Sequence, residues 1–339
     1  MRVGFYNFYD SLNRNRMFRE LSSGLGDDLL FPIVNLGKRL LERGHTFSTI
    51  DMDALESFDA VVFLDFPPEN NDFFRRLTAS RFQNLYLIIF ESSIHRPENF
   101  DPRNHLFFKK VFTWDDALVD GDKFIKMNFA QKIPSDIELS AEARSRLCAA
   151  IFSNKSSDHP QELYSERIKA IRWFEAHHPE DFDLYGIGWN EFTFKGPRLI
   201  RALNRVRSLR KLFAPRYPSY RGPVKSKRET LSGYKFAISY ENAKGFQGYI
   251  TEKIFDSFFA GCVPIYIGAT NVSEHIPSNC FIDLRRFRGY DDLYEFMSRM
   301  PDEVYRRYLD NIMEFVRGPK INPYSAEFFA ETLIKHVCD

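Results

Sequence analysis

The sequence predicts an α/β protein in which two domains each contain a parallel sheet. Short apolar segments of strand character alternate with helical segments over residues 3–113, and a second alternating series runs over residues 149–283. Between them, around residues 129–145, the apolar rhythm gives way to the polar run Gln131-Lys-Ile-Pro-Ser-Asp136. The length of 339 residues also exceeds what one hydrophobic core holds comfortably.

The first series contains five predicted strands and two predicted helices. The strands are short apolar runs, and the helices repeat their apolar residues at helical spacing. We predict strands over 3–6, 46–50, 60–64, 85–90 and 110–113, with helices over 31–43 and 72–80. This alternation is typical of the βαβ units of a parallel sheet.

The lapse in the apolar rhythm predicts the domain boundary. We expect a first domain over residues 1–145 and a second over 146–318, with a new strand at 149–153. Helical patterns at 303–316 and 326–337 are separated by a segment with glycine and proline, so residues 319–339 form a closing helix that can cross back to the first domain.

Composition limits the class of protein. The net charge of +1 gives no argument for a nucleic-acid partner. The four cysteines form no C-x-x-C pair, and we expect them to be reduced. The chain starts directly with a predicted strand, without the pattern of a leader, and no apolar run approaches the length of a bilayer span. We therefore expect a cytoplasmic protein.

Residues 234–253 combine a buried-strand pattern, a polar loop with glycines and a helix start. A predicted core strand at 236–240 leads into a loop with two glycines at 245 and 248, where the backbone can turn and approach a ligand. Thr251 then opens a helix and its side chain can cap free N–H groups. With Lys253 in the first turn and Asn242 and Tyr249 nearby, this helix start favours an anion such as the diphosphate of a sugar nucleotide.

This segment resembles the donor-site motif of glycosyltransferase family 10, the α-1,3/1,4-fucosyltransferases. The family pattern F-x-x-x-x-E-N, followed by G-Y-[VI]-T-E-K, is matched at 236–242 and 248–253. The match continues through Gly261-Cys-Val-Pro-Ile-Tyr-Ile-Gly268 and on to Pro277. A match in register over about fifty residues is specific. The resemblance covers 146–285 and is weaker before that.

The resemblance implies the GT-B architecture, two Rossmann-like domains facing a cleft, with the acceptor bound by the first domain and GDP-fucose by the second. It implies an inverting α-1,3-fucosyltransferase that moves L-fucose from GDP-β-L-fucose to an oligosaccharide or lipid-linked glycan containing N-acetylglucosamine or glucose. Members from animals and plants usually carry a membrane anchor and disulfides, so this chain resembles the bacterial branch. The alternatives are a transferase for another nucleotide-activated sugar and a non-catalytic protein that binds a nucleotide sugar.

An inverting transfer needs one carboxylate to take the proton of the acceptor hydroxyl. Glu91 is the candidate base because it follows the strand at 85–90, which places it at a strand carboxyl end. Its context, Phe90-Glu-Ser-Ser with Pro97, Asn99 and Phe100 downstream, resembles the family motif around the proposed base. His95 is the rival base.

The departing GDP carries negative charge that cations stabilise. The family has an arginine some distance after an S-N strand end, and Ser153-Asn154 is followed by Arg167 at the corresponding place. Arg172 is a competitor because the gap varies in length. We expect Arg167 and Lys253 to bind the diphosphate.

Three further residues complete the predicted donor site. Tyr249 can donate its hydroxyl to phosphate, and Asn242 can bridge phosphate or ribose. Glu252 can accept from sugar or nucleotide hydroxyls, and it can also steady positive charge on the sugar during transfer, which makes it a second catalytic candidate. An apolar packing role for Tyr249 and helix-dipole pairing for Glu252 are the simpler alternatives.

The sequence contains no convincing metal-binding motif. Asp115-Asp116 and Asp181-Phe-Asp183 are interpreted as capping or solvated residues, so no metal ligand is predicted. A divalent cation, Mn²⁺ or Mg²⁺, is compatible with the hypothesis as a stimulating ion but is not required.

Residues 198–228 contain eleven Lys or Arg and no acid. Apolar residues recur near helical spacing from 197 to 213, which predicts a basic amphipathic helix. Three interpretations remain open: a solvated flap at the edge of the donor site, a membrane-surface contact, or a nucleic-acid patch. The second would make the protein peripheral to the inner face of the membrane.

Overall fold

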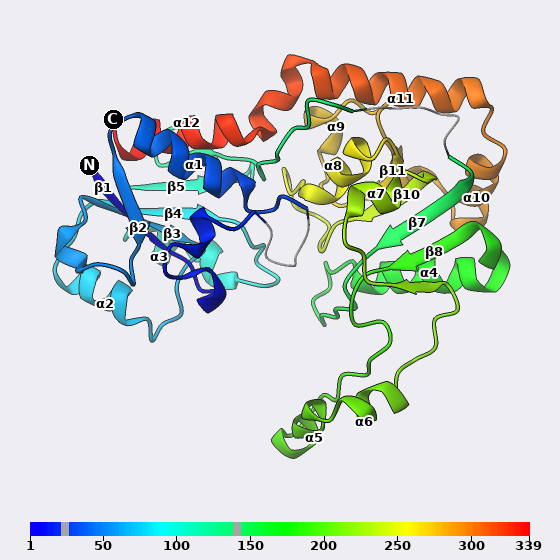
Figure 1. The fold of residues 1–339 in the computed structure, drawn as a ribbon, viewed down its shortest axis with the longest axis horizontal. Coiled ribbons are helices and arrows are strands. Elements are labelled where there is room, and N and C mark those ends of the chain that lie inside the picture. Colours follow the sequence, from blue (N-terminus) through cyan, green and yellow to red (C-terminus); the bar gives the residue numbers. More distant parts are fainter. Residues whose placement is uncertain (22–26, 138–143) are drawn as a thin grey trace.

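The computed structural model describes residues 1–21, 27–137 and 144–339, and within these ranges the chain builds two separate six-stranded sheets (Figure 1). Every neighbouring pair of strands is parallel. The predicted α/β class with two parallel sheets is confirmed. The predicted boundary at residue 145 falls where the chain changes sheets, next to residues 138–143, which lie outside the described ranges.

The first sheet has the strand order β2-β1-β3-β4-β5-β6. Its central strands are apolar on both faces, as expected where helices cover both sides of a parallel sheet. All five predicted strands of this half are present to within one residue at either end. The strands are β1 (Arg2–Tyr6), β2 (Thr46–Thr49), β3 (Ala60–Leu64), β4 (Leu85–Ile89), β5 (Lys110–Thr113) and β6 (Phe124–Lys126).

Helices cover the two faces of the first sheet. On one face, α1 (Phe31–Glu42) packs over the side chains of Val3 and Phe5. On the other, α2 (Asp72–Ala79) buries Leu77 against Val61 and Phe63, and a short α3 (Pro102–His105) follows β4. The 3-10 helices of this half are η1 (Asp10–Leu12), η2 (Arg16–Phe18), η3 (Leu55–Ser57) and η4 (Pro97–Phe100).

The second sheet has the order β9-β8-β7-β10-β11-β12, in which the direction of winding reverses between β7 and β10. Ligands of open α/β sheets bind at the strand carboxyl ends beside such a reversal. The predicted strand at 149–153 begins three residues earlier than expected. The strands are β7 (Arg146–Ile151), β8 (Phe182–Tyr185), β9 (Tyr220–Gly222), β10 (Tyr234–Tyr240), β11 (Val263–Ile267) and β12 (Ile282–Asp283).

The largest core surrounds this sheet. Phe236 and Ile238 of β10 are buried together with Ile254 and Phe258 of α8 (Glu252–Phe259), so the apolar side of this helix is its core face. The remaining elements are α4 (Tyr164–His177), η5 (Pro179–Asp181), α7 (Lys227–Leu231), α8 (Glu252–Phe259), α9 (Val272–His275), η7 (Leu284–Arg286) and α10 (Tyr290–Ser298).

The C-terminal helices connect the two halves. α11 (Asp302–Arg317) lies on the second sheet's core, and after η8 (Pro319–Tyr324) the chain crosses so that α12 (Ala326–Val337) packs beside α1 (Figure 1). Leu333 and Ile334 are buried in the core of the first sheet, and Asn35 Nδ2 donates to Ala326 O at 3.1 Å. The closing helix therefore belongs spatially to the first sheet.

The predicted single helix over 197–213 is wrong. The segment forms α5 (Arg198–Ala202), η6 (Leu203–Arg205) and α6 (Arg207–Leu212), with an extended residue, Val206 (φ −99°, ψ 95°), between them. Pairs such as Arg201 and Arg205 bring like charges four residues apart, which opposes a continuous helix, and no core face is available to offset this.

Within the described ranges, no helix combines the length and the apolar character needed to cross a lipid bilayer.

Candidate active site

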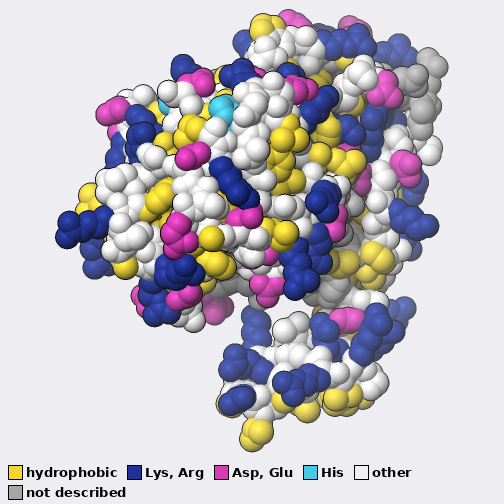
Figure 2. Space-filling view, turned by 60° about the vertical axis from the view of Figure 1, so that its left-hand side comes forward, with side chains coloured by type: hydrophobic (Ala, Val, Ile, Leu, Met, Phe, Trp, Pro, Cys, Tyr) yellow, Lys and Arg dark blue, Asp and Glu magenta, His cyan; other side chains and the backbone are white. Residues whose placement is uncertain are grey.

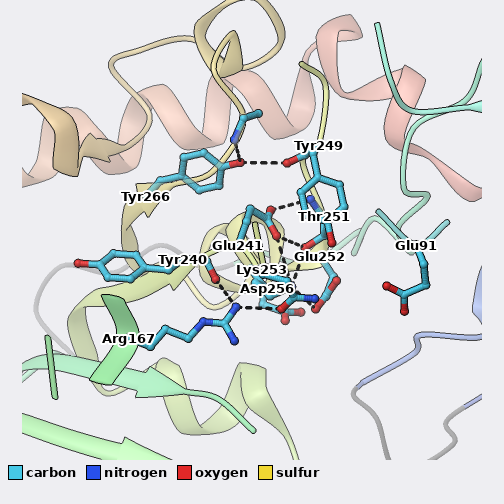
Figure 3. A network of polar contacts seen from close by, with 12 residues as sticks. Glu91, Arg167, Tyr240, Glu241, Tyr249, Thr251, Glu252, Lys253, Asp256 and Tyr266 are labelled. Atoms are coloured by element: carbon cyan, nitrogen blue, oxygen red, sulfur yellow. Dashed lines mark hydrogen bonds and ion pairs between the residues drawn. The ribbon is translucent and has the colours of Figure 1, made fainter. Parts of the chain in front are cut away.

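A cavity of about 580 Å³ lies at the strand carboxyl ends of both sheets. Its walls come from loops after β1, β3 and β4 of the first sheet and after β7 and β10 of the second. Every site residue predicted from the sequence lines it: Glu91, Arg167, Asn242, Tyr249, Glu252 and Lys253. The fold thus brings together residues separated by up to 162 positions, with Glu91 supplied by the opposite sheet (Figure 3).

Arg167 is a buried cation with an unused donor. Its side chain lies on α4, only 4% of the residue is exposed, and Nη2 donates to Tyr240 O at 2.7 Å and to Asn242 Oδ1 at 3.0 Å. Within the described residues, Nε has no hydrogen-bond partner and no carboxylate forms an ion pair with the guanidinium. Burial lowers the pKa of Arg167 from its usual range. A buried guanidinium with a free N–H beside a cavity is suited to an anionic ligand.

Arg172, the competing arginine, lies elsewhere. Five residues further along α4, it points away from the cavity, where Nη1 contacts Glu175 Oε2 at 2.6 Å and Arg216 O at 2.9 Å. Its guanidinium stacks on the ring of Tyr217 at 3.9 Å. Five residues rotate a helix by about 140°, so the two arginines cannot face the same ligand.

Lys253 lies in the first turn of α8 and is already paired with carboxylates. Its Nζ lies 3.3 Å from Glu241 Oε2 and 3.2 Å from Glu252 Oε1, and it donates to Thr251 Oγ1 at 2.9 Å. A phosphate at this helix start would share the lysine with these two acids.

Glu241 is the main residue that our sequence reasoning missed. It is fully buried at the end of β10, and it accepts from Thr251 N at 2.7 Å and from Thr251 Oγ1 at 2.6 Å (Figure 3). Burial raises the pKa of Glu241, and Lys253 opposes that shift. The predicted capping role of Thr251 is wrong: it occupies the N-cap position, but its hydroxyl bonds to Glu241 instead of to the helix. Glu241 therefore ties β10 to the start of α8. The E-N pair at the strand end was the available signal.

Glu252 stays ionised. Burial disfavours its charged form, but Lys253 and Lys227 outweigh burial and lower the pKa of Glu252. Lys227, on α7, also pairs with Asp256 Oδ2 at 2.6 Å. The cavity wall therefore presents a carboxylate that accepts hydrogen bonds and supports positive charge.

Tyr249 is 2% exposed and packs among aromatic rings of both halves. Its ring centroid lies 4.7 Å from that of Trp114 and 5.8 Å from that of Phe129. Burial raises the pKa of Tyr249, so the hydroxyl stays protonated and available as a donor. The packing alternative and the donor role are both compatible with this position.

Glu91 is oriented by a buried carboxylate that the sequence did not reveal. Asp65, which follows β3 with a left-handed backbone (φ 61°), accepts from the N–H of Phe90 at 2.8 Å and of Glu91 at 3.0 Å. Asn99 Nδ2 donates to Asp65 Oδ1 at 2.7 Å and to Glu91 O at 3.1 Å. Burial raises the pKa of Asp65 to about 6. The loop that carries Glu91 is thus held by several buried hydrogen bonds.

His95 lies behind Glu91 and does not line the cavity. Its Nδ1 is 3.5 Å from Glu91 Oε2, and its Nε2 is 2.8 Å from the hydroxyl of Tyr164 on α4. Burial lowers the pKa of His95, as do Lys155 and Lys253. Burial raises the pKa of Glu91, although Lys155 and Lys253 partly offset this. The two rival bases are neighbours, and only the carboxylate reaches the cavity.

The acidic residues considered as metal ligands have other partners. Asp116 contacts Lys126 Nζ at 2.5 Å and His275 Nε2 at 2.7 Å, and Asp183 contacts Arg221 Nε at 2.5 Å. The interpretation of these two as capping or solvated residues is therefore wrong. Asp115 does accept from Ala117 N in a turn. In the described part of the chain, His178, Glu180 and Asp181 could together hold an ion, but they do not line the cavity.

The chain was compared with known proteins. Residues 141–316, just over half of the 339 residues, match the family described as glycosyltransferase family 10 (fucosyltransferase), C-terminal part. Curated relatives include an alpha-(1,3)-fucosyltransferase, FucT, of Helicobacter pylori, 35% identical over 91 residues, and an alpha-(1,4)-fucosyltransferase of Arabidopsis thaliana, 37% identical over 80 residues. These matches cover 27% and 23% of this chain but only 19% and 20% of the two relatives.

Two solved structures share the overall fold. A crystal structure of an alpha1,3-fucosyltransferase with GDP-fucose covers 100% of this chain and 90% of its own, with a TM-score of 0.56 and 15% identity. A crystal structure of Anabaena HepE in complex with UDP and glucose covers 99% of both chains, with a TM-score of 0.57 and 11% identity.

Proposed function

The chain belongs to glycosyltransferase family 10, the fucosyltransferases, and has the GT-B fold, and from this premise we propose that it is an inverting α-1,3-fucosyltransferase that uses GDP-β-L-fucose. The observation that carries the proposal is the juxtaposition in one cavity of a buried arginine with a free donor and a carboxylate of raised pKa from the opposite sheet. The arginine can stabilise the charge of a departing nucleoside diphosphate, and the carboxylate can act as a general base.

The donor diphosphate binds at the switch point of the second sheet. Arg167 offers its free Nε, Asn242 and Tyr249 offer polar side chains, and the helix start at Lys253 adds amide donors. A phosphate there lowers the cost of burying the guanidinium, because it supplies the counter-charge that the described residues do not. A GDP-fucose complex of a structural relative supports this choice of donor.

Transfer proceeds by direct displacement at the anomeric carbon. The acceptor hydroxyl oxygen attacks that carbon and its proton passes to Glu91, while the bond from the carbon to the β-phosphate oxygen breaks and GDP leaves. Glu252 steadies the positive charge that develops on the sugar, and Arg167 and Lys253 stabilise the negative charge on the leaving phosphate. Attack opposite to the leaving group inverts the configuration.

The acceptor is proposed to be an oligosaccharide or lipid-linked glycan with an N-acetylglucosamine or glucose unit, attacked through its 3-hydroxyl. Phe8 and Tyr9, which follow β1, line the same cavity on the Glu91 side and offer aromatic faces to a sugar ring. The protein is proposed to act in the cytoplasm, where reduced cysteines are expected, and the four cysteines here are free.

The test is an assay of the purified chain with a panel of nucleotide sugars, each labelled in the sugar, and a panel of glycan acceptors. The expected result is label transfer from GDP-fucose to an acceptor with a free 3-hydroxyl, with α configuration in the product. Transfer from another nucleotide sugar would replace the donor assignment. GDP-fucose binding without transfer to any acceptor would favour a non-catalytic binding protein.

A further inference from the structure

A basic and apolar arm projects from the second half of the molecule. The arm, residues 191–216, connects β8 to β9 and carries α5, η6 and α6 away from both sheets (Figure 1). None of its residues is buried. Residues 186–187, which lie between β8 and the arm, line the cavity of the candidate active site, as do residues 223–225, which follow β9. The arm therefore begins within a few residues of the cavity wall.

The arm exposes apolar side chains that the fold does not use. It holds seven of the eighteen large hydrophobic residues that are exposed in the described ranges, and none of the seven belongs to a hydrophobic core. Leu199 is 86% exposed and Leu212 is 75% exposed. Apolar residues gather at the far end of the projecting part, with Lys and Arg around them (Figure 2). A concentration of this kind marks an interaction surface.

The arm is also strongly basic. It contains eight Lys or Arg and one acid, Glu191, which pairs with Arg207 at 3.2 Å and Arg210 at 2.8 Å. Arg198, Arg201 and Arg205 form no ion pair with any residue in the described ranges and remain available to a partner. The chain as a whole has a net charge of only +1, so this positive charge is local.

Internal contacts hold the arm in shape. The side chain of Asn204 accepts from Phe194 N at 2.8 Å and donates to Phe194 O at 2.9 Å, and Phe192 N donates to Arg210 O at 2.7 Å. The rings of Phe192 and Phe194 meet at 4.9 Å. The apolar residues are thus presented outward by an organised segment.

We propose that the arm docks on a membrane surface rich in anionic lipid. The apolar residues at its far end enter the headgroup region, and Arg198, Arg201 and Arg205 contact lipid phosphates. Charge complementarity favours this partner, and the exposed apolar side chains distinguish it from a nucleic acid, whose phosphates would leave Leu199 and Leu212 without a contact. A solvated flap explains neither feature.

Docking would bring the start of the arm close to the lipid, and residues 186–187, which precede the arm, belong to the cavity wall. If the chain has the proposed fucosyltransferase activity, membrane docking favours an acceptor glycan that is linked to a lipid over one that diffuses freely. Lipid binding itself is measured without turnover, so it can fail or succeed independently of the proposed activity.

The experiment is co-sedimentation of the full chain with vesicles of phosphatidylcholine, with or without about 30% phosphatidylglycerol, at about 50 mM and 500 mM salt. The unmodified protein should bind the anionic vesicles at low salt and release at high salt. A triple variant, Arg198→Glu, Arg201→Glu and Arg205→Glu, should lose at least about a hundredfold in apparent affinity, since each basic residue near the surface adds about 1 kcal/mol. The matched control reverses three exposed arginines outside the arm, Arg286, Arg306 and Arg317, and should bind like the unmodified protein.

A second pair of variants tests the apolar end. Leu199→Ser with Leu212→Ser should weaken binding to anionic vesicles severalfold, whereas Leu41→Ser with Leu106→Ser, also exposed leucines, should not. Equal binding to neutral and anionic vesicles, or equal loss in the control variants, would overturn the proposal. Tight binding of a DNA or RNA duplex without binding to vesicles would also overturn it. A change of oligomeric mass in the leucine variant with unchanged vesicle binding would overturn it as well.

Discussion

Replacing Arg167 by Met should weaken GDP binding while the same change at Arg172 should not. Both residues lie on α4, but only Arg167 lines the cavity, and its Nε has no partner among the described residues. Met keeps much of the aliphatic volume and removes the charge. The phosphate then loses at least one hydrogen bond to a charged group, which contributes about 1.5–3 kcal/mol. We therefore expect the Kd for GDP to rise about 10- to 150-fold.

The stability of the Arg167→Met variant separates binding from folding. Removing the guanidinium leaves Tyr240 O and Asn242 Oδ1 without their donor, which costs about 1–3 kcal/mol, but it also removes the cost of a buried charge. These terms oppose each other, so we expect the free energy of unfolding to change by no more than about 2 kcal/mol and the protein to remain folded.

The assay is isothermal titration calorimetry with GDP, alongside circular dichroism to confirm folding. Arg172→Met loses an ion pair with Glu175 that lies away from the cavity, and it should keep the Kd of the unmodified protein. A folded Arg167→Met protein with unchanged GDP affinity would mean that Arg167 does not bind the phosphate. Equal weakening in both variants would also contradict the prediction, because the effect would then come from α4 as a whole.

Three further predictions test the carboxylates. Glu91→Gln cannot accept the proton, so transfer should fall about a hundredfold or more at nearly unchanged GDP-fucose affinity; retained activity in a transfer assay would move the search for the base to Glu252. Glu241→Gln removes one of the two carboxylates paired with Lys253, so urea unfolding should show a free energy of unfolding lower by about 1–3 kcal/mol. An unchanged free energy of unfolding would mean that the buried pair is not stabilising. The folded pKa of Asp65 is about 6, above its usual 3.8, so the folded state binds the extra proton and stability falls as pH rises from about 4 to 6, by about 3 kcal/mol. Asp65→Asn should remove that loss in urea unfolding at the two pH values, and an unaltered pH slope would contradict it.

Local patterning determined much of the fold. The five predicted strands of the first sheet end within one residue of where apolar runs end in the sequence, because a strand buried on both faces cannot extend into polar residues. The start of α8 followed from a glycine loop and from the threonine after it. β6 was not predicted, since three residues carry too little periodic signal and the strand depends on pairing with β5.

Local sequence did not decide the partners of the site residues. Arg167 and Arg172 have similar surroundings in sequence, and only the packing of α4 turns one toward the cavity and the other toward Glu175. The sequence offers both Glu91 and His95 as candidates for the general base. The fold places His95 next to Glu91 but outside the cavity lining, hydrogen-bonded to Tyr164 of the other half.

Sequence patterns were enough to predict the family, the α/β alternation and the residue types of the donor site, because these depend on near neighbours in the chain. Tertiary structure alone decided that Asp65 orients the loop of Glu91, that Glu241 pairs with Lys253, and that the basic segment becomes a broken, projecting arm. Each of these depends on burial and on contacts that local sequence patterns do not show. A buried charge needs a partner, and the fold decides which residue that is. An exposed helix has no core to pack against, so nothing offsets its low stability.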